Sequence, residues 1–158
     1  MVELKPSTEE LVAFARDLAR QHLQKMEGFY PFGVARSESH GNQINVGLDD
    51  ADTWPLVAAW LKKKSLDQDV HALASCADHQ MRREGALPPD DRGKRGCFSI
   101  HVEERDGPSL DVWQPYVLVE GAVAFEPEQR TEGVRQFFPQ RGILGWLKNL
   151  RTSRVRLD

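Results

Sequence analysis

Hydrophobic residues in the first part of the chain recur at intervals of three and four positions, the spacing of one face of an α-helix. The stripe comprises Leu11, Phe14, Ala15, Leu18, Ala19, His22, Leu23 and Met26. Just before it, the run Ser7-Thr8-Glu9-Glu10 follows the capping-box pattern, in which Ser7 caps the first turn and Glu10 reaches back to the cap amide. The spacing therefore predicts a helix that begins at Ser7, ends before Gly28 and packs this stripe against a core.

Aromatic residues cluster directly after this helix, in the segment EGFYPFG at residues 27–33. Pro31 cannot donate a hydrogen bond to a sheet, so it favours the first positions of a strand, here predicted over 29–37. We expect Phe29 and Phe32 to be core residues, because aromatic clusters at a helix–strand junction are usually buried. The turn-rich residues 37–42 and the alternating segment 43–48 complete a predicted hairpin.

The middle of the chain predicts a second helix followed by further strands. This helix starts at Asp52 or Thr53, tolerates Pro55 in its first turn and ends at the lysines of 62–64. Strands are predicted over 70–77, 97–104 and 110–119, with a short addition at 122–125. Within 97–104, apolar and polar residues alternate, which predicts one buried face and one face in water. The apolar set is Phe98, Ile100 and Val102, and the polar set is Ser99, His101 and Glu103.

The predicted elements follow the order helix, strand, strand, helix, strand, strand, strand, helix. Consecutive strands joined by short turns favour an antiparallel sheet over a parallel one. The sequence therefore predicts an α+β fold in which an antiparallel sheet of about five strands carries helices, as a single domain over residues 1–158. The order is also similar to that of roadblock- and profilin-like proteins, an analogy of element order that implies no function.

Two short motifs carry a resemblance to a protein family. The run EGFYPFGVA at 27–35, and HVEERDG at 101–107 before an aromatic-rich strand, resemble small uncharacterised bacterial α+β proteins with an FYPFG-type first strand. The resemblance spans about residues 10–120. It implies a bacterial α+β protein, and it implies no activity.

Composition and charge narrow the classes of function. The 158 residues are 40% hydrophobic and 28% charged, with a net charge of −3, so the chain can form an ordinary core and has no general affinity for nucleic acid. The polar first residues do not make a secretion signal, and no apolar run approaches the roughly 18 residues of a membrane span. We expect a cytoplasmic protein without a cofactor, whose Cys76 and Cys97 are free thiols.

Candidate metal ligands occur close together in the run HALASCADH, which holds His71, Cys76 and His79. On a strand Cys76 faces away from both histidines, and on a helix only Cys76 and His79 become neighbours. A structural zinc site needs four ligands, so we expect no metal here.

Candidate catalytic residues are few. Cys97 follows Lys94-Arg95-Gly96, whose positive charge favours a thiolate, and His101 shares its strand parity. The two would still lie about 13 Å apart along a strand. If the protein is an enzyme, then Cys97, His40 and His101 are the candidates, but no convergent catalytic set is evident and we expect none.

The end of the chain, RGILGWLKNLRTSRVRLD at 141–158, has five basic residues and one acidic residue, which leaves −7 on residues 1–140. Apolar residues at helical spacing predict an amphipathic basic helix and tail over 132–158, docked on the sheet through its apolar side. Arg151, Arg154 and Arg156 are then candidate contacts for a partner. Peripheral contact of this helix with a membrane surface is the alternative.

Three classes of function follow from these patterns. The first is a non-catalytic protein-binding domain, as an interaction scaffold or a homodimer. The second is an immunity-type inhibitor of a bacterial toxin or effector, because an acidic surface steers association toward a basic enzyme. The third is an enzyme with an unrecognised site. The lack of a convergent catalytic set favours binding to a protein partner or self-association.

Overall fold

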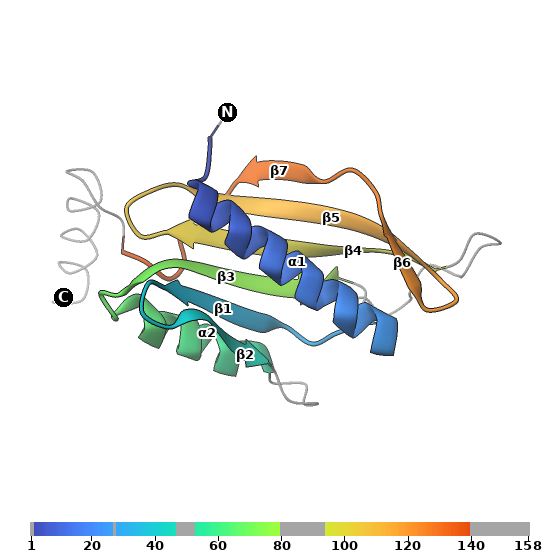
Figure 1. The fold of residues 1–158 in the computed structure, drawn as a ribbon, viewed down its shortest axis with the longest axis horizontal. Helices are drawn as coiled ribbons and strands as arrows, with labels where there is room; N and C mark the ends of the chain where they lie inside the picture. The colour runs from blue at the N-terminus through green and yellow to red at the C-terminus, as the bar shows by residue number, and fades with distance from the viewer. Residues whose placement is uncertain (1, 27, 47–52, 80–93, 140–158) are drawn as a thin grey trace, which may run out of the picture.

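One antiparallel sheet of seven strands organises the computed structural model, which describes residues 2–26, 28–46, 53–79 and 94–139 (Figure 1). Two helices pack on the sheet within these residues. The elements are α1 (Pro6–Met26), β1 (Phe32–Ser37), β2 (Gly41–Val46), α2 (Thr53–Ser65), β3 (Val70–Asp78), β4 (Lys94–Glu104), β5 (Ser109–Val119), β6 (Ala122–Phe125) and β7 (Gln129–Glu132). The α+β class and the antiparallel sheet are confirmed.

The strands lie in the order β2-β1-β3-β4-β5-β6, and β7 also pairs with β5. β6 pairs with the end of β5 and β7 with its beginning, so together they cover one side of this long strand. The hairpin from β5 to β6 turns over two residues, Glu120 and Gly121, which both have positive φ. Such a turn matches the twist of the flanking strands, and Gly121 takes this backbone conformation without steric cost.

The first face of the sheet, which we name the α1 face, carries the larger apolar cluster. Figure 1 shows α1 running obliquely across this face. Phe29 and Phe32 are fully buried there with ring centroids 5.6 Å apart, and Phe29 also contacts Phe98 at 5.7 Å. The prediction that these two aromatic residues belong to the core is confirmed, because they fill the junction between α1 and the central strands.

The opposite face, the α2 face, has a smaller apolar cluster at one side. Helix α2 contacts β1, β2 and β3, where Val57 and Leu61 pack on Ala35 and Leu73. Leu61 also lies against Gly33, where a Cβ atom would come within 3.0 Å of it. Helix α2 does not extend over β4 and β5. The side chains of these two strands on the α2 face therefore contact other parts of the chain.

The predicted count of about five strands is wrong, because the sheet has seven. The predicted order of elements is also wrong at its end, where β6 and β7 follow β5. Residues 129–132 form strand β7 and residues 133–139, which we call the C-terminal segment, contain no helix. Residues 140–158, with most of the predicted basic helix, lie outside the described residues. The described elements therefore do not follow the roadblock- or profilin-like order.

The start of α1 also differs from the predicted capping box. The helix begins at Pro6, and the amides of Thr8 and Glu9 both donate to the Lys5 carbonyl oxygen, at 2.9 and 3.0 Å. Proline suits the first helical position because its missing N–H would have no partner there. The Lys5 amide in turn donates to Glu104 at 2.7 Å, which fixes the helix start to the end of β4.

Candidate binding pocket

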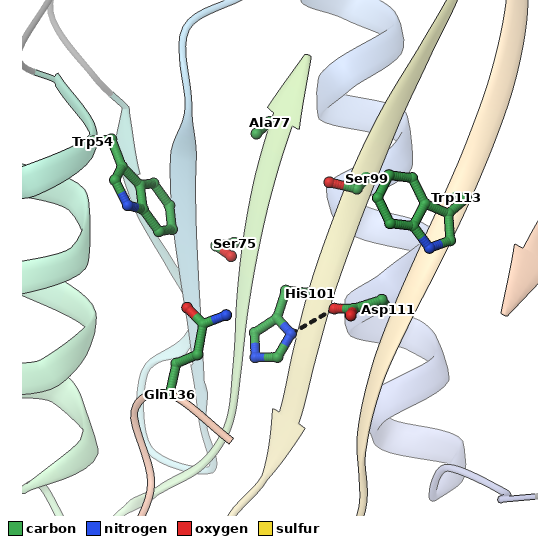
Figure 2. Close-up of a pocket in the computed structure, with 8 residues that line it drawn as sticks. All are labelled: Trp54, Ser75, Ala77, Ser99, His101, Asp111, Trp113 and Gln136. Carbon is green, nitrogen blue, oxygen red and sulfur yellow. Dashed lines mark hydrogen bonds and ion pairs between the residues drawn. The ribbon is translucent and has the colours of Figure 1, made fainter. Parts of the chain in front are cut away.

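A polar pocket of about 350 Å³ lies on the α2 face, between α2, the central strands and the C-terminal segment (Figure 2). Its base consists of the small residues Ser75, Ala77 and Ser99 on β3 and β4. Trp54 from α2 and Trp113 from β5 lie on opposite sides. His101, Asp111 and Gln136 form its polar end. Strand alternation explains the pocket, since small polar residues on adjacent strands point to one face and leave it hollow.

His101 connects two carboxylates at the polar end. Its Nδ1 lies 2.6 Å from Asp111 Oδ1, and its Nε2 lies 2.7 Å from Glu103 Oε2. The Glu103 side chain is fully buried, whereas the Asp111 side chain is 31% exposed. An imidazolium can donate through both nitrogens at once, so the geometry fits a positively charged His101 between two negative groups.

The pKa values of this cluster follow from competing effects. Burial lowers the pKa of His101, but the hydrogen bonds and charges of Glu103 and Asp111 outweigh it and raise the pKa above its ordinary value. Burial raises the pKa of Glu103, but the bonds from His101 and from backbone amides outweigh it and lower the pKa. Both shifts stabilise the charged forms of the pair.

Glu103 holds the C-terminal segment against the sheet. Its carboxylate accepts from the amides of Gln136 at 2.8 Å, Phe137 at 3.2 Å and Phe138 at 3.0 Å. The side chains of Phe137 and Phe138 are buried beside α2. These contacts explain why no helix forms over 133–139, since the amides that a helix would use are bonded to Glu103.

Arg105 and Arg135 complete the attachment of this segment. Arg105 donates to the carbonyl oxygens of Val70 at 2.8 Å and Ser65 at 3.0 Å, and its guanidinium lies 4.6 Å from the Phe138 ring centroid. Arg135 donates to the carbonyl oxygens of Gly107 at 3.2 Å and Arg105 at 2.8 Å. The predicted wet face of β4 is thus wrong at His101 and Glu103, which the C-terminal segment and its contacts bury.

Beside the pocket, His79 contacts two of the lining residues, Ser99 and Trp113. His79 Nε2 lies 2.8 Å from Ser99 Oγ, and the His79 ring stacks on Trp113 with centroids 5.1 Å apart. A serine beside a histidine is a nucleophile–base pair in many hydrolases. Here Ser99 lies inside β4, whose backbone pairs with β3 on one side and β5 on the other. The backbone amides of β4 around Ser99 are therefore paired within the sheet and cannot stabilise an oxyanion.

The candidate catalytic residues from the sequence fall in different places. His101 lies in the pocket, but carboxylates engage both of its ring nitrogens, so it has no free nitrogen to act as a base. Cys97 is half-buried on the same face of β4, four residues away. His40 is in the exposed turn between β1 and β2, beside Ser39 and Asp69. The structure does not bring the three together.

The candidate metal ligands also separate. Cys76 is buried on the α1 face, while His79 lies at the pocket on the α2 face. Across the described ranges, no group of three or more His, Cys, Asp or Glu side chains could hold a metal ion. Arg151, Arg154 and Arg156 lie outside the described residues.

Neither described helix has the length and apolar character needed to cross a membrane. Comparison of the chain with known protein families, curated proteins and solved structures gives no match. The function is therefore inferred from the geometry of this chain.

Sequence reasoning missed most of this pocket. The sequence pattern places Trp54 only within the second helix, and Asp111 and Trp113 only within a strand. A usable signal was present, because Ser99, His101 and Glu103 share one face of a central strand. Small and charged residues on an interior strand indicate either a covered polar network or a hollow. In this protein both occur side by side.

Proposed function

We propose that the protein is a non-catalytic protein-binding domain that receives its partner on the α2 face, at the Trp54–Trp113 pocket. One observation carries the proposal: Trp113, 37% exposed, borders a polar pocket that also presents a partly exposed carboxylate, Asp111. Exposed tryptophans beside polar groups are typical of the residues that contribute most to protein interfaces.

The chemistry of the pocket supports binding over catalysis. His101 and Glu103 bond to each other, and Glu103 also accepts from the amides of the C-terminal segment. Both side chains therefore have a structural role and do not provide a free acid or base. Ser99 has a base but lacks amide donors to stabilise a transition state. Rigid polar groups around a hollow are, in contrast, what specific binding of another molecule requires.

The charge of the chain favours a basic partner over a second copy. Residues 1–140 carry a net charge of −7, so two copies of this region repel each other at long range. A basic protein is attracted by the same field. An immunity-type inhibitor of a basic toxin or effector enzyme is one form that such a domain can take.

The experiment compares the wild-type protein with two matched tryptophan variants. Trp113→Leu removes the aromatic side of the pocket, and Trp60→Leu removes a tryptophan of α2 that does not line it. Proteins captured from the source cells are identified, purified and titrated against all three forms by calorimetry. We expect a partner whose affinity falls about tenfold or more with Trp113→Leu and hardly changes with Trp60→Leu.

Two results would contradict the proposal. One is a purified partner that binds Trp113→Leu as tightly as the wild type, since its site would then lie elsewhere. The other is a partner-free monomer whose mass, measured by light scattering, does not change with concentration and which captures nothing selectively.

A further inference from the structure

We propose that the pocket binds the guanidinium group of an arginine side chain that the partner presents. This inference rests on the proposed function and names the chemical group that the α2 face recognises. It is carried by the charge of the pocket, by its two indole rings and by the positions of its hydrogen-bond acceptors.

The pocket has an excess of negative charge at its polar end. With His101 protonated, the set of Glu103, His101 and Asp111 carries a net charge of −1. His101 shares its positive charge between the two carboxylates, so one negative charge remains on the set. That charge is most accessible at Asp111, because its side chain is the most exposed of the three.

Asp111 retains the capacity to bind a ligand. Only its Oδ1 is bonded, to His101, and Oδ2 receives no hydrogen bond from the described residues. None of the described residues that line the pocket is a lysine or an arginine, and His101, the lining residue that carries a positive charge, contacts Oδ1 of Asp111. A cationic group from outside would thus meet Oδ2 as its acceptor.

The two tryptophans favour a flat organic cation. The indole rings of Trp54 and Trp113 lie on opposite sides of the pocket in Figure 2. Indole faces attract cations and stack with the planar guanidinium group. His79 covers part of Trp113 and holds it in place, with an interplanar angle of 30°.

The acceptors are also spread in the way that a guanidinium requires. Asp111 lies at one end, Ser75 and Ser99 at the base, and Gln136 at the rim (Figure 2). A guanidinium has five N–H donors in one plane and can reach several such groups together, whereas an ammonium is a compact, strongly hydrated charge. A bare metal ion fits less well, because indoles and hydroxyls on an open hollow of about 350 Å³ do not make a coordination shell.

The test uses small probes that differ in charge but hardly in shape. N-acetylarginine amide carries the guanidinium, and N-acetylcitrulline amide replaces it with a neutral urea of nearly the same size. Each is titrated into the ¹⁵N-labelled full chain, and the indole N–H signals of its four tryptophans are followed by nuclear magnetic resonance. We expect saturable shifts at Trp54 and Trp113 with the arginine probe and affinity about tenfold lower with the citrulline probe.

Two carboxamide variants locate the charge that matters. Asp111→Asn keeps an oxygen that can accept from His101, and we expect it to weaken binding of the arginine probe severalfold. Asp17→Asn, on the exposed side of α1, changes the total charge equally and should leave binding unchanged. A circular dichroism melt checks that both variants remain folded.

The outcomes separate this inference from the proposed function. Equal affinity for the two probes, or an unchanged affinity in Asp111→Asn, would overturn guanidinium recognition. If a purified partner still depends on Trp113 in that case, the protein-binding role stands and the recognised group is different. If the arginine probe binds selectively but no protein partner depends on Trp113, the guanidinium site stands and the proposed function fails.

Discussion

The two faces of the sheet are built on different principles. The α1 face is closed by α1 and by buried rings such as Phe29, Phe32 and Phe98. The α2 face is closed only in part by apolar contacts, and around β4 it depends on the charged residues Glu103, His101 and Arg105. Apolar packing stabilises without specifying a ligand, whereas a rigid polar network beside a hollow can do both. This contrast places the candidate site on the α2 face.

The α1 face also holds a buried polar pair. Tyr116 donates its hydroxyl proton to Asp78, with the oxygens 3.2 Å apart, inside the apolar cluster. Burial raises the pKa of Tyr116, and the negative charge of Asp78 raises it further. The hydroxyl therefore stays protonated and continues to donate. Neither residue lines the pocket, whereas His101 and Asp111 on the α2 face do.

The largest effect is expected from Phe32→Ala on the α1 face. Removing this fully buried ring leaves a cavity beneath α1, so we expect a loss of about 3–5 kcal/mol in the free energy of unfolding, measured in denaturant. Leu66→Ala, at a residue that is 75% exposed, is the control and should change stability by less than about 0.5 kcal/mol. An unchanged unfolding midpoint for Phe32→Ala would show that the α1 face is not the main core.

On the α2 face the largest loss is expected from Glu103→Gln. The amide keeps the shape but removes the charge that His101 and three backbone amides share, so stability should fall by about 2–3 kcal/mol. Hydrogen exchange at the amides of Gln136, Phe137 and Phe138 should accelerate. Glu38→Gln, on the exposed β1–β2 turn, is the matched control. Unchanged protection of these amides would show that Glu103 does not hold the C-terminal segment.

The stability contributed by the α2 face should also depend on pH, which is a smaller effect that distinguishes it from the α1 face. The pKa of His101 is raised, so its bonds stabilise the fold fully below about pH 6.5 and lose this contribution as the pH rises through the raised pKa. The pKa of Glu103 is lowered, so its contribution is full above about pH 4.5 and is lost as the pH falls through the lowered pKa.

The measurement is the free energy of unfolding across this pH range for the wild type and for His101→Gln. The difference between the two should shrink as the pH rises, because glutamine does not titrate. A difference that stays constant above pH 6.5 would mean that His101 is neutral in the folded protein. Phe32→Ala should show no such dependence above about pH 6.5, because burial lowers the pKa of His22, the histidine whose ring lies 5.7 Å from that of Phe32, and keeps it neutral there.

The faces also differ in how well the sequence predicts them. On the α1 face, periodic apolar residues in α1 and alternating ones in β4 predict the core directly, because burial of apolar area depends mainly on local pattern. The short strand at 122–125 also follows from its pattern. The structure of the α2 face depends instead on contacts between residues far apart in the sequence. Glu103, for example, accepts hydrogen bonds from backbone amides more than thirty positions later. No periodicity encodes such a contact.

Within residues 133–139, the predicted helix is absent for the same reason. Local propensity allowed a helix there, but Arg135 bonds to carbonyl oxygens of the β4–β5 turn and the following amides bond to Glu103. These tertiary hydrogen bonds outweigh a weak local preference. Trp113 and Asp111 were likewise visible as strand residues, while their convergence with Trp54 depends on where α2 docks.

The last and smallest effect is the chemical reactivity of the two free cysteines, which compares the faces without a mutation. Cys76 is fully buried on the α1 face, and burial, followed by the charge of Asp78, raises the pKa of its thiol well above the ordinary value. Cys97 is only half-buried, on the α2 face of β4. Since the thiolate is the reactive form, we expect iodoacetamide to modify Cys97 much faster than Cys76 in the native protein. Mass spectrometry of peptides after a time course measures both rates, and in denaturant the two rates should become similar. Faster reaction at Cys76 in native conditions would mean that α1 opens readily, and the α1 face would then not be the closed side of the sheet.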